Sequence, residues 1–170
     1  MLSYIRLKNF RSYKEASFEF NDGVNIIVGP TASGKTNLLE AILVSARGSS
    51  YRVADQDLIM FNKPWLRIDA GLDNGEQRVV KIKREGDKSS KSYAVNDKPY
   101  ARLPRQHSWP TVLFEPSHLL MLLNGQPEAR RQYLDDILEQ LKPSYGPTRR
   151  HYKRVLAQRN ALLKRNPTEL

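Results

Sequence analysis

A phosphate-binding pattern lies near the N-terminus of this 170-residue chain, where residues 29–36 read Gly29-Pro30-Thr31-Ala32-Ser33-Gly34-Lys35-Thr36. This stretch satisfies G-x-x-x-x-G-K-[ST]. Its two glycines let the backbone curl so that successive N–H groups face a phosphate, and the lysine adds a cation for the β- and γ-phosphates. The threonine hydroxyl is a ligand for Mg²⁺. The pattern predicts that residues 29–36, together with Asn37, bind a nucleotide.

The residues on either side favour a nucleotide site over a glycine turn that ends in Lys-Thr by chance. Residues 24–28 read Val-Asn-Ile-Ile-Val, a mostly β-branched run that predicts a buried strand. After the loop, Leu38, Ile42 and Ala46 recur at helical spacing, which predicts a helix over 35–46. The positive end of that helix dipole would point at the bound phosphate. Strand, loop and helix in this order are the context that the pattern requires.

Short strands with tight turns make up most of the remaining first part of the chain. Alternation of apolar and polar residues predicts strands near residues 3–8 and 18–20, and over 65–72, 77–83 and 91–95. Asp73-Asn74-Gly75 predicts a hairpin between two of them. Residues 98–110, with three prolines, are expected to form a loop, and 111–114 are expected to form another buried strand.

The chain becomes helical after Pro127. Pro127-Glu128 is a typical helix opening, and an apolar stripe follows until Pro143, made by Leu134, Ile137, Leu138 and Leu141. A last helix is expected from about residue 146 toward residue 165. We therefore expect two parts, a nucleotide-binding lobe over residues 1–126 and the beginning of a helical arm over residues 127–170.

Composition excludes several classes of protein. The chain has no cysteine, so it contains no disulfide framework, thiolate metal site or cysteine nucleophile. No window approaches the roughly 18 apolar residues of a membrane span, and the N-terminus lacks the apolar block of a signal peptide. These features exclude secreted and integral-membrane classes, and we expect a cytoplasmic protein without a membrane partner.

Positive charge concentrates near the C-terminus. The net charge is +10, and eight basic residues and no acidic one lie between Lys142 and Arg165. Three interpretations remain open for this segment: contact with DNA phosphates, pairing with an acidic helix, or an ordinary solvated face. The candidates for DNA contact are Arg149, Arg150, Lys153 and Arg154.

An acid that completes a nucleotide-hydrolysing site is not evident. Glu115, at the end of the expected strand 111–114, is the local candidate, with an ordinary strand-to-loop glutamate as the alternative. Asp135 and Asp136 are expected on a solvated helix face, and the three histidines lack metal-ligand spacing. We therefore assign no catalytic residue.

With these motifs in place, the chain resembles the RecF family of bacterial recombination-mediator ATPases, which belongs to the SMC and ABC-type group. The first matching stretch is Leu7-Lys8-Asn9-Phe10-Arg11-Ser12-Tyr13. The match continues at Phe18, Phe20, Gly23, Asn25, the phosphate loop, and residues 37–42, 48–52, 112–116, 130–135 and 155–164. It covers nearly the whole chain.

The resemblance implies an α/β fold: a P-loop NTPase of the ABC-ATPase type, whose head lobe has an antiparallel β arm and continues into a helical arm. It implies ATP and Mg²⁺ as cofactors, with Thr36 at the metal and ATP acting as a dimerisation switch. It also implies binding to single-stranded, gapped or junction DNA, partners of the RecO and RecR kind, and a role in DNA replication, damage repair and the SOS response. By the same resemblance Arg11 would reach the nucleotide phosphates, with a solvated turn residue as the alternative.

Two departures from the family pattern bear on this expectation. The family usually has Asn-Gly where this chain has Thr31-Ala32, and alanine lacks the freedom of glycine to adopt positive φ. We therefore expect a slightly different or restricted loop. The signature motif and acidic strand of such ATPases lie beyond the helical arm, so we expect a truncated N-terminal lobe. Weak ATPase activity would then belong to the complete protein and not to this chain alone.

A self-contained P-loop phosphotransferase is the alternative function. The loop has the same spelling as that of tRNA dimethylallyltransferases, which are tRNA-modifying enzymes. Such an enzyme would need its acid and its acceptor pocket within these 170 residues, whereas a head lobe relies on other parts of a longer chain.

Overall fold

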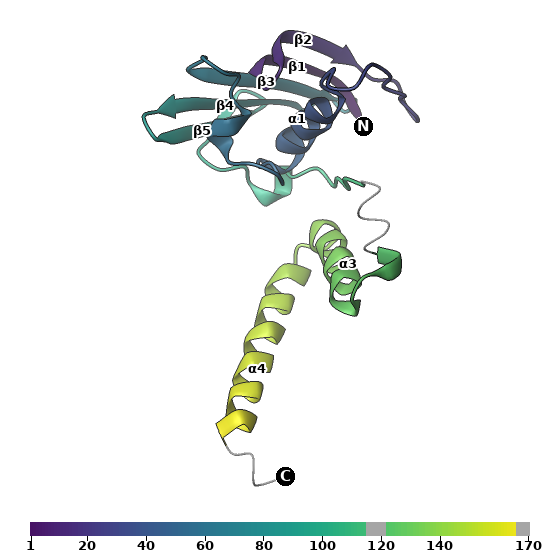
Figure 1. Ribbon diagram of the computed structural model, residues 1–170, viewed down its shortest axis with the longest axis vertical. Coiled ribbons are helices and arrows are strands. Elements are labelled where there is room, and N and C mark those ends of the chain that lie inside the picture. The colour runs from purple at the N-terminus through teal and green to yellow at the C-terminus, as the bar shows by residue number, and fades with distance from the viewer. Residues whose placement is uncertain (115–121, 166–170) are drawn as a thin grey trace. The chain divides into compact units, whose positions relative to one another are not determined.

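The computed structural model describes residues 1–114 and 122–165 (Figure 1). Two compact units are distinguished, Met1–Leu113 and Phe114–Leu170. The first unit contains the sheet and the phosphate loop, and the second contains two helices. The domain boundary that we placed between residues 126 and 127 stays a prediction.

The first unit is built on one antiparallel sheet of six strands, in the order β2-β1-β3-β4-β5-β6. The strands are β1 Leu2–Phe10, β2 Tyr13–Glu19, β3 Trp65–Leu72, β4 Gln77–Glu85, β5 Lys88–Val95 and β6 Lys98–Tyr100. Apolar residues alternate along the central strands, so they meet on one face of the sheet: Leu7 pairs with Ile68, and Ile68 with Val80. All three are buried.

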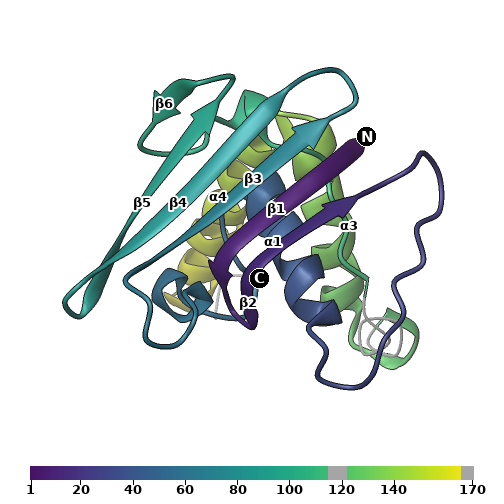
Figure 2. The same ribbon diagram turned by 90° about the horizontal axis from the view of Figure 1, so that it is seen from above.

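Helix α1, Lys35–Arg47, covers that apolar face (Figure 2). Leu38, Ala41 and Val44 lie on the buried side of the helix and belong to the same apolar cluster as the strand residues. The short helix η1, Asp55–Leu58, adds the buried Leu58, and a second short helix, η2, spans Arg105–His107. The sheet therefore supports the helix that begins at the phosphate loop.

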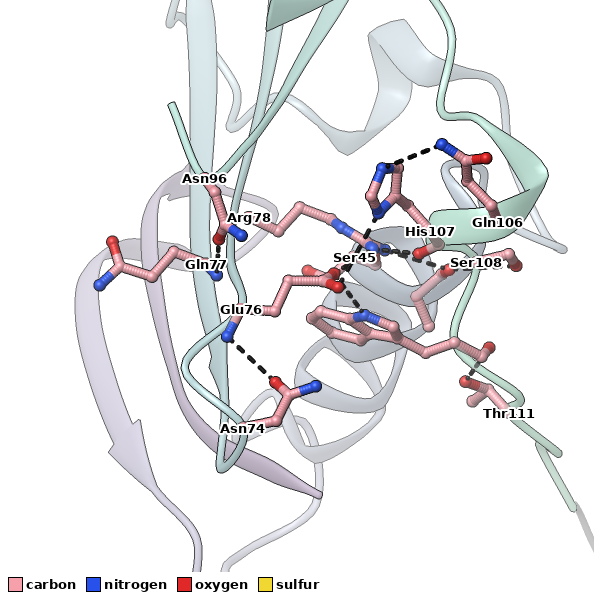
Figure 3. Close-up of polar contacts among 12 residues, drawn as sticks. Ser45, Asn74, Glu76, Gln77, Arg78, Asn96, Gln106, His107, Ser108 and Thr111 are labelled. Atoms are coloured by element: carbon pink, nitrogen blue, oxygen red, sulfur yellow. Dashed lines mark hydrogen bonds and ion pairs between the residues drawn. The ribbon is translucent and has the colours of Figure 1, made fainter. Parts of the chain in front are cut away.

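The C-terminal end of α1 is fastened by a buried arginine (Figure 3). The Arg78 side chain, on β4, is fully buried and donates to the carbonyl oxygens of Ser45 and Ala46, at 2.6 and 3.3 Å. It also pairs with Glu76 at 2.8 Å and lies 4.1 Å from the ring centre of Trp109. Helix-end carbonyls lack partners within their own helix. Arg78 supplies a partner for the Ser45 carbonyl and shares the Ala46 carbonyl with the Trp109 N–H, which donates to it at 3.1 Å.

The second unit contains α3, Pro127–Leu141, and α4, Tyr145–Arg165. No residue of α3 is buried. A Cβ on Gly146 of α4 would meet the carboxylate end of the Glu139 side chain on α3. Both helices agree with the prediction from sequence. Within the two described ranges, no helix is long and apolar enough to cross a membrane.

Three predictions about strands were wrong. Residues 24–28 form no strand, and Val24, Ile26 and Val28 are 88%, 82% and 84% exposed. Residues 111–114 form no strand either. A β-branched run becomes a strand only beside another strand, and nothing in the described part of the chain pairs with these two segments. The short edge strand β6 instead forms where a loop was expected, because its three residues pair with the end of β5.

Candidate nucleotide-binding site

The phosphate loop is an exposed turn that leads directly into α1. Residues 31–34 form the turn, closed by a 3.2 Å hydrogen bond from the Ser33 N–H to the Pro30 carbonyl. Gly34 is the N-cap of α1 with φ +98°, a conformation that favours glycine. The loop has little contact with the rest of the protein, except at the buried Gly34.

Ala32 occupies the left-handed region with φ +66°. Alanine thus adopts here the positive φ that it reaches less freely than glycine, and the expected restriction of the loop stays a prediction. The turn requires a left-handed residue there, and alanine accepts it at a cost of about 1 kcal/mol. The loop thus keeps a glycine-like backbone at the position where the family usually has glycine.

Lys35 folds back over the loop. Its ammonium group donates to the carbonyl oxygens of Gly29 and Pro30, both at 2.7 Å. These two hydrogen bonds hold a positive charge at the loop, and neutral carbonyls are partners that a phosphate oxygen can replace.

The N-terminus of α1 suits an anion. No side chain caps it, and its first turn contains no acidic residue. The first N–H groups of a helix have no partner within the helix, so this positive end lacks any carboxylate that would compensate it. Thr36, beside it, is exposed. No group of three or more metal-binding side chains occurs in the described part of the chain. The prediction that Thr36 would hold Mg²⁺ stays a prediction.

The turn between β1 and β2 packs against the loop and the start of α1. The Tyr13 hydroxyl donates to the Gly34 carbonyl at 3.1 Å, and the Asn37 amide donates to the Ser12 hydroxyl at 3.0 Å. A Cβ on Gly34 would lie only 2.9 Å from the Tyr13 hydroxyl oxygen. Gly34 is therefore required twice, for its positive φ and for this close contact.

Arg11, from the same turn, contacts a buried carboxylate. Its Nε lies 3.1 Å from Oε2 of Glu40, which is fully buried on α1, and its Nη1 donates to the Asp57 carbonyl at 3.0 Å. The Ser50 hydroxyl donates to the other carboxylate oxygen of Glu40 at 2.6 Å. The predicted contact between Arg11 and nucleotide phosphates stays a prediction. Glu40 was not predicted from the sequence to be a functional residue. Its position four residues before Val44, on the buried side of a helix, was the pattern that could have indicated a buried carboxylate.

The candidate DNA-binding residues have different surroundings. Arg149 is 12% exposed and lies 2.9 Å from Asp135, 3.3 Å from Asp136 and 3.4 Å from Glu139. Asp135 and Asp136 are therefore not merely a solvated face, because they hold α4 against α3. Arg150 is 60% exposed and 3.5 Å from Glu139.

Lys153 and Arg154, farther along α4, are exposed. The predicted DNA contacts of these four residues stay predictions. Glu115 and His118 lie outside the described residues.

Comparison with known proteins identifies relatives of the whole chain. The family model described as an AAA domain matches residues 4–155. The RecF protein of Heliobacterium modesticaldum, named a DNA replication and repair protein, is 39% identical over 164 residues. That alignment covers 95% of this chain and 44% of the relative. The RecF protein of Desulforamulus reducens, with the same name, is 39% identical over 163 residues, 94% of this chain and 43% of the relative. The chain thus spans less than half the length of these relatives.

Solved structures agree with the fold. A structure described as the recombination mediator protein RecF-ATP in the RecFOR pathway superposes with a TM-score of 0.67 at 28% identity, covering 99% of this chain and 46% of that one. A structure from a study of ATP-driven dimerisation of SMC ATPases gives a TM-score of 0.62 at 22% identity, which shows likeness of fold alone. The expected P-loop fold of the ABC type and the resemblance to the N-terminal part of RecF proteins are both confirmed.

Proposed function

We propose, starting from the fact that this chain belongs to the AAA domain family, that it is the ATP-binding N-terminal part of a RecF-like DNA replication and repair protein. The observation that carries the proposal is the uncapped N-terminus of α1 with Lys35 held at the loop. A helix end without a capping side chain or an acid is ready to bind a phosphate.

Each part of the loop is expected to make a different contact with the nucleotide. Free backbone N–H groups of the loop and of the first turn of α1 would contact the phosphates, and Lys35 would leave its two carbonyl partners to neutralise them. The exposed Thr36 hydroxyl holds Mg²⁺, which supplies charge neutralisation at the β- and γ-phosphates when bound. Asn37, which donates to Ser12 of the β1–β2 turn, and Arg11 of that turn would add contacts to the nucleotide.

The finer functions of the family extend the proposal. The complete protein would bind single-stranded, gapped or junction DNA, use ATP to form a dimer, and act with RecO-like and RecR-like partners in the cytoplasm during DNA damage and the SOS response. The similarity to RecF relatives supports these functions. In the family that the chain resembles, the signature motif and the acidic strand lie beyond the helical arm, so we expect this chain to bind ATP without turning it over.

Titration with a fluorescent ATP analogue in the presence of Mg²⁺ tests nucleotide binding. We expect Lys35→Ala to weaken binding at least tenfold, because the loop loses its cation. Lys98→Ala removes the same charge from an exposed position on β6 and is expected to leave binding unchanged. Equal affinity in the wild type, Lys35→Ala and Lys98→Ala would contradict the proposed site.

Release of inorganic phosphate tests the absence of turnover. We expect no more than a single turnover from this chain. Sustained hydrolysis that is lost in Lys35→Ala would show that these residues already contain the complete catalytic machinery, and it would favour the self-contained phosphotransferase.

A further inference from the structure

One face of the sheet turns away from α1 (Figure 2), and the burial pattern of the central strands places several cations on it. Side chains alternate along a strand, so the neighbours of the buried residues on β1, β3 and β4 point to the opposite face. There they form a basic face, which we define as Arg6, Lys8, Arg67, Lys81 and Lys83. Asp69 is the acid that lies among them on β3.

The register places like charges directly beside each other. Lys8 pairs with Arg67, and Arg67 pairs with Lys81, so three cations form one row across three strands. Like charges opposite each other destabilise a sheet. Asp69 lies 2.6 Å from Arg67, and Glu15 lies 3.3 Å from Lys8, so this end of the row is partly neutralised. An anion bound on the face would neutralise the rest.

At the β4 end of the basic face, Glu85 follows Lys83 by two residues on the same side of the strand, and its Oε1 accepts a hydrogen bond from the Ser90 hydroxyl at 2.6 Å. Lys81 and Lys83 are both exposed, and neither forms an ion pair with any residue that the structure describes. They lie two positions apart on one strand, so both point to the same side. These two lysines are the cations that are most available to an external anion.

An aromatic ring lies beside them. Trp65 is 37% exposed and pairs with Lys83 across β3 and β4. Two shallow hollows meet at this tryptophan and at Arg67: one is also lined by Lys81 and Lys83, and the other by Arg6 and Lys8. An exposed indole between cations suits nucleic-acid bases, which stack on the ring while the phosphates contact the cations.

We propose that the basic face binds single-stranded DNA, with phosphates on Lys81 and Lys83 and a base stacked on Trp65. This inference rests on the proposed function in DNA repair and assigns its DNA contacts to the sheet instead of α4. An acidic protein segment would also contact the lysines. Trp65, however, offers a stacking surface that unpaired bases use and acidic side chains do not.

Fluorescence anisotropy with a labelled oligothymidylate tests the assignment. We expect the double variant Lys81→Gln/Lys83→Gln to weaken binding about tenfold. The slope of log affinity against log salt should become shallower by about 1.4, since each lost phosphate contact removes roughly 0.7.

Trp65→Ala should weaken binding, and Trp65→Phe, which keeps an aromatic ring, should restore most of it. The matched control is Lys98→Gln/Arg102→Gln, which removes two exposed charges outside the basic face and should bind as the wild type does. The α4 variant Lys153→Gln/Arg154→Gln tests the competing assignment. Circular dichroism checks that each variant is folded.

The outcomes separate this inference from the proposed function. Binding that survives in the sheet variants but falls in the α4 variant would overturn the inference and leave the role in DNA repair intact. Competition by polyglutamate as effective as that by oligothymidylate, with no effect of Trp65→Ala, would identify a general polyanion surface and also overturn it. A wild-type chain that binds no oligonucleotide even at low salt would overturn the DNA-binding part of the proposed function as well. The ATP titration tests the nucleotide site independently.

Discussion

At the scale of single residues, Ala32 stores strain in the phosphate loop. Its φ of +66° is a conformation that glycine adopts without cost. We expect Ala32→Gly to raise the free energy of unfolding by up to about 1 kcal/mol, because relief of the strain exceeds the extra entropy of glycine in the unfolded chain. Urea denaturation of the first unit measures it. Ala94→Gly, on β5 where it pairs with both β4 and β6, is the control and should lower stability by about 0.5–1 kcal/mol. If both variants changed the free energy of unfolding in the same direction, the result would contradict strain at Ala32.

Tyr93 links stability to alkaline pH. Burial, with a smaller contribution from the Asp55 carboxylate, raises the pKa of Tyr93 to about 12. Its hydroxyl donates to the Gly48 carbonyl at 2.6 Å. The pKa of Tyr93 is higher in the folded than in the unfolded state. Its contribution to stability is therefore complete below pH about 10 and is lost as the pH rises toward 12.

Denaturation curves at a series of pH values test this linkage. Between pH about 10 and 12, the wild type should lose up to about 3 kcal/mol more stability than Tyr93→Phe, which cannot ionise. The other tyrosines and the lysines titrate in both proteins, so the difference isolates Tyr93. If the stability of the two proteins fell equally with rising pH, Tyr93 would have the same pKa in the folded and the unfolded state.

At the scale of elements, Arg78 decides how α1 is held on the sheet. We expect Arg78→Met to lower the free energy of unfolding by about 3 kcal/mol, because Glu76 and two helix-end carbonyls lose a buried charged partner. Arg84→Met, on the same strand but exposed, should change stability by less than about 0.5 kcal/mol. Thermal denaturation compares them. A similar small effect in both variants would show that α1 does not depend on this anchor.

The sequence predicts helices and strands well where the residues that define an element lie close together along the chain. Helix α1 and strand β3 were predicted to within one residue, because apolar spacing and the turn at Asp73-Asn74-Gly75 are local signals. The run 24–28 carries an equally strong local signal, yet its strand requires a neighbour that the described residues do not supply. Glu40 and Arg78 escaped prediction because a charged residue in an apolar pattern becomes understandable only when its partner, distant in sequence, is known.

At the scale of the whole molecule, the two units differ in how much side chain they bury. The first has a core of fourteen clustered residues, whereas α3 has no buried residue. We expect amide hydrogens of α1, β1, β3 and β4 to exchange slowly, and those of α3 and α4 to exchange orders of magnitude faster, since local opening there exposes little new apolar surface. Hydrogen-exchange mass spectrometry measures this. Equal protection in both units would mean that they unfold together.

The exposed run at residues 24–28 has a practical consequence for handling the protein. Valine and isoleucine without charge or proline are the composition of segments that stack into cross-β zippers between chains. Gly23 and Gly29 bound the run, so no charged gatekeeper is adjacent to it. Concentrated solutions of this chain should therefore form intermolecular sheets through this segment. The substitution Ile26→Lys would prevent this association, because the stacked lysine charges of neighbouring chains repel each other.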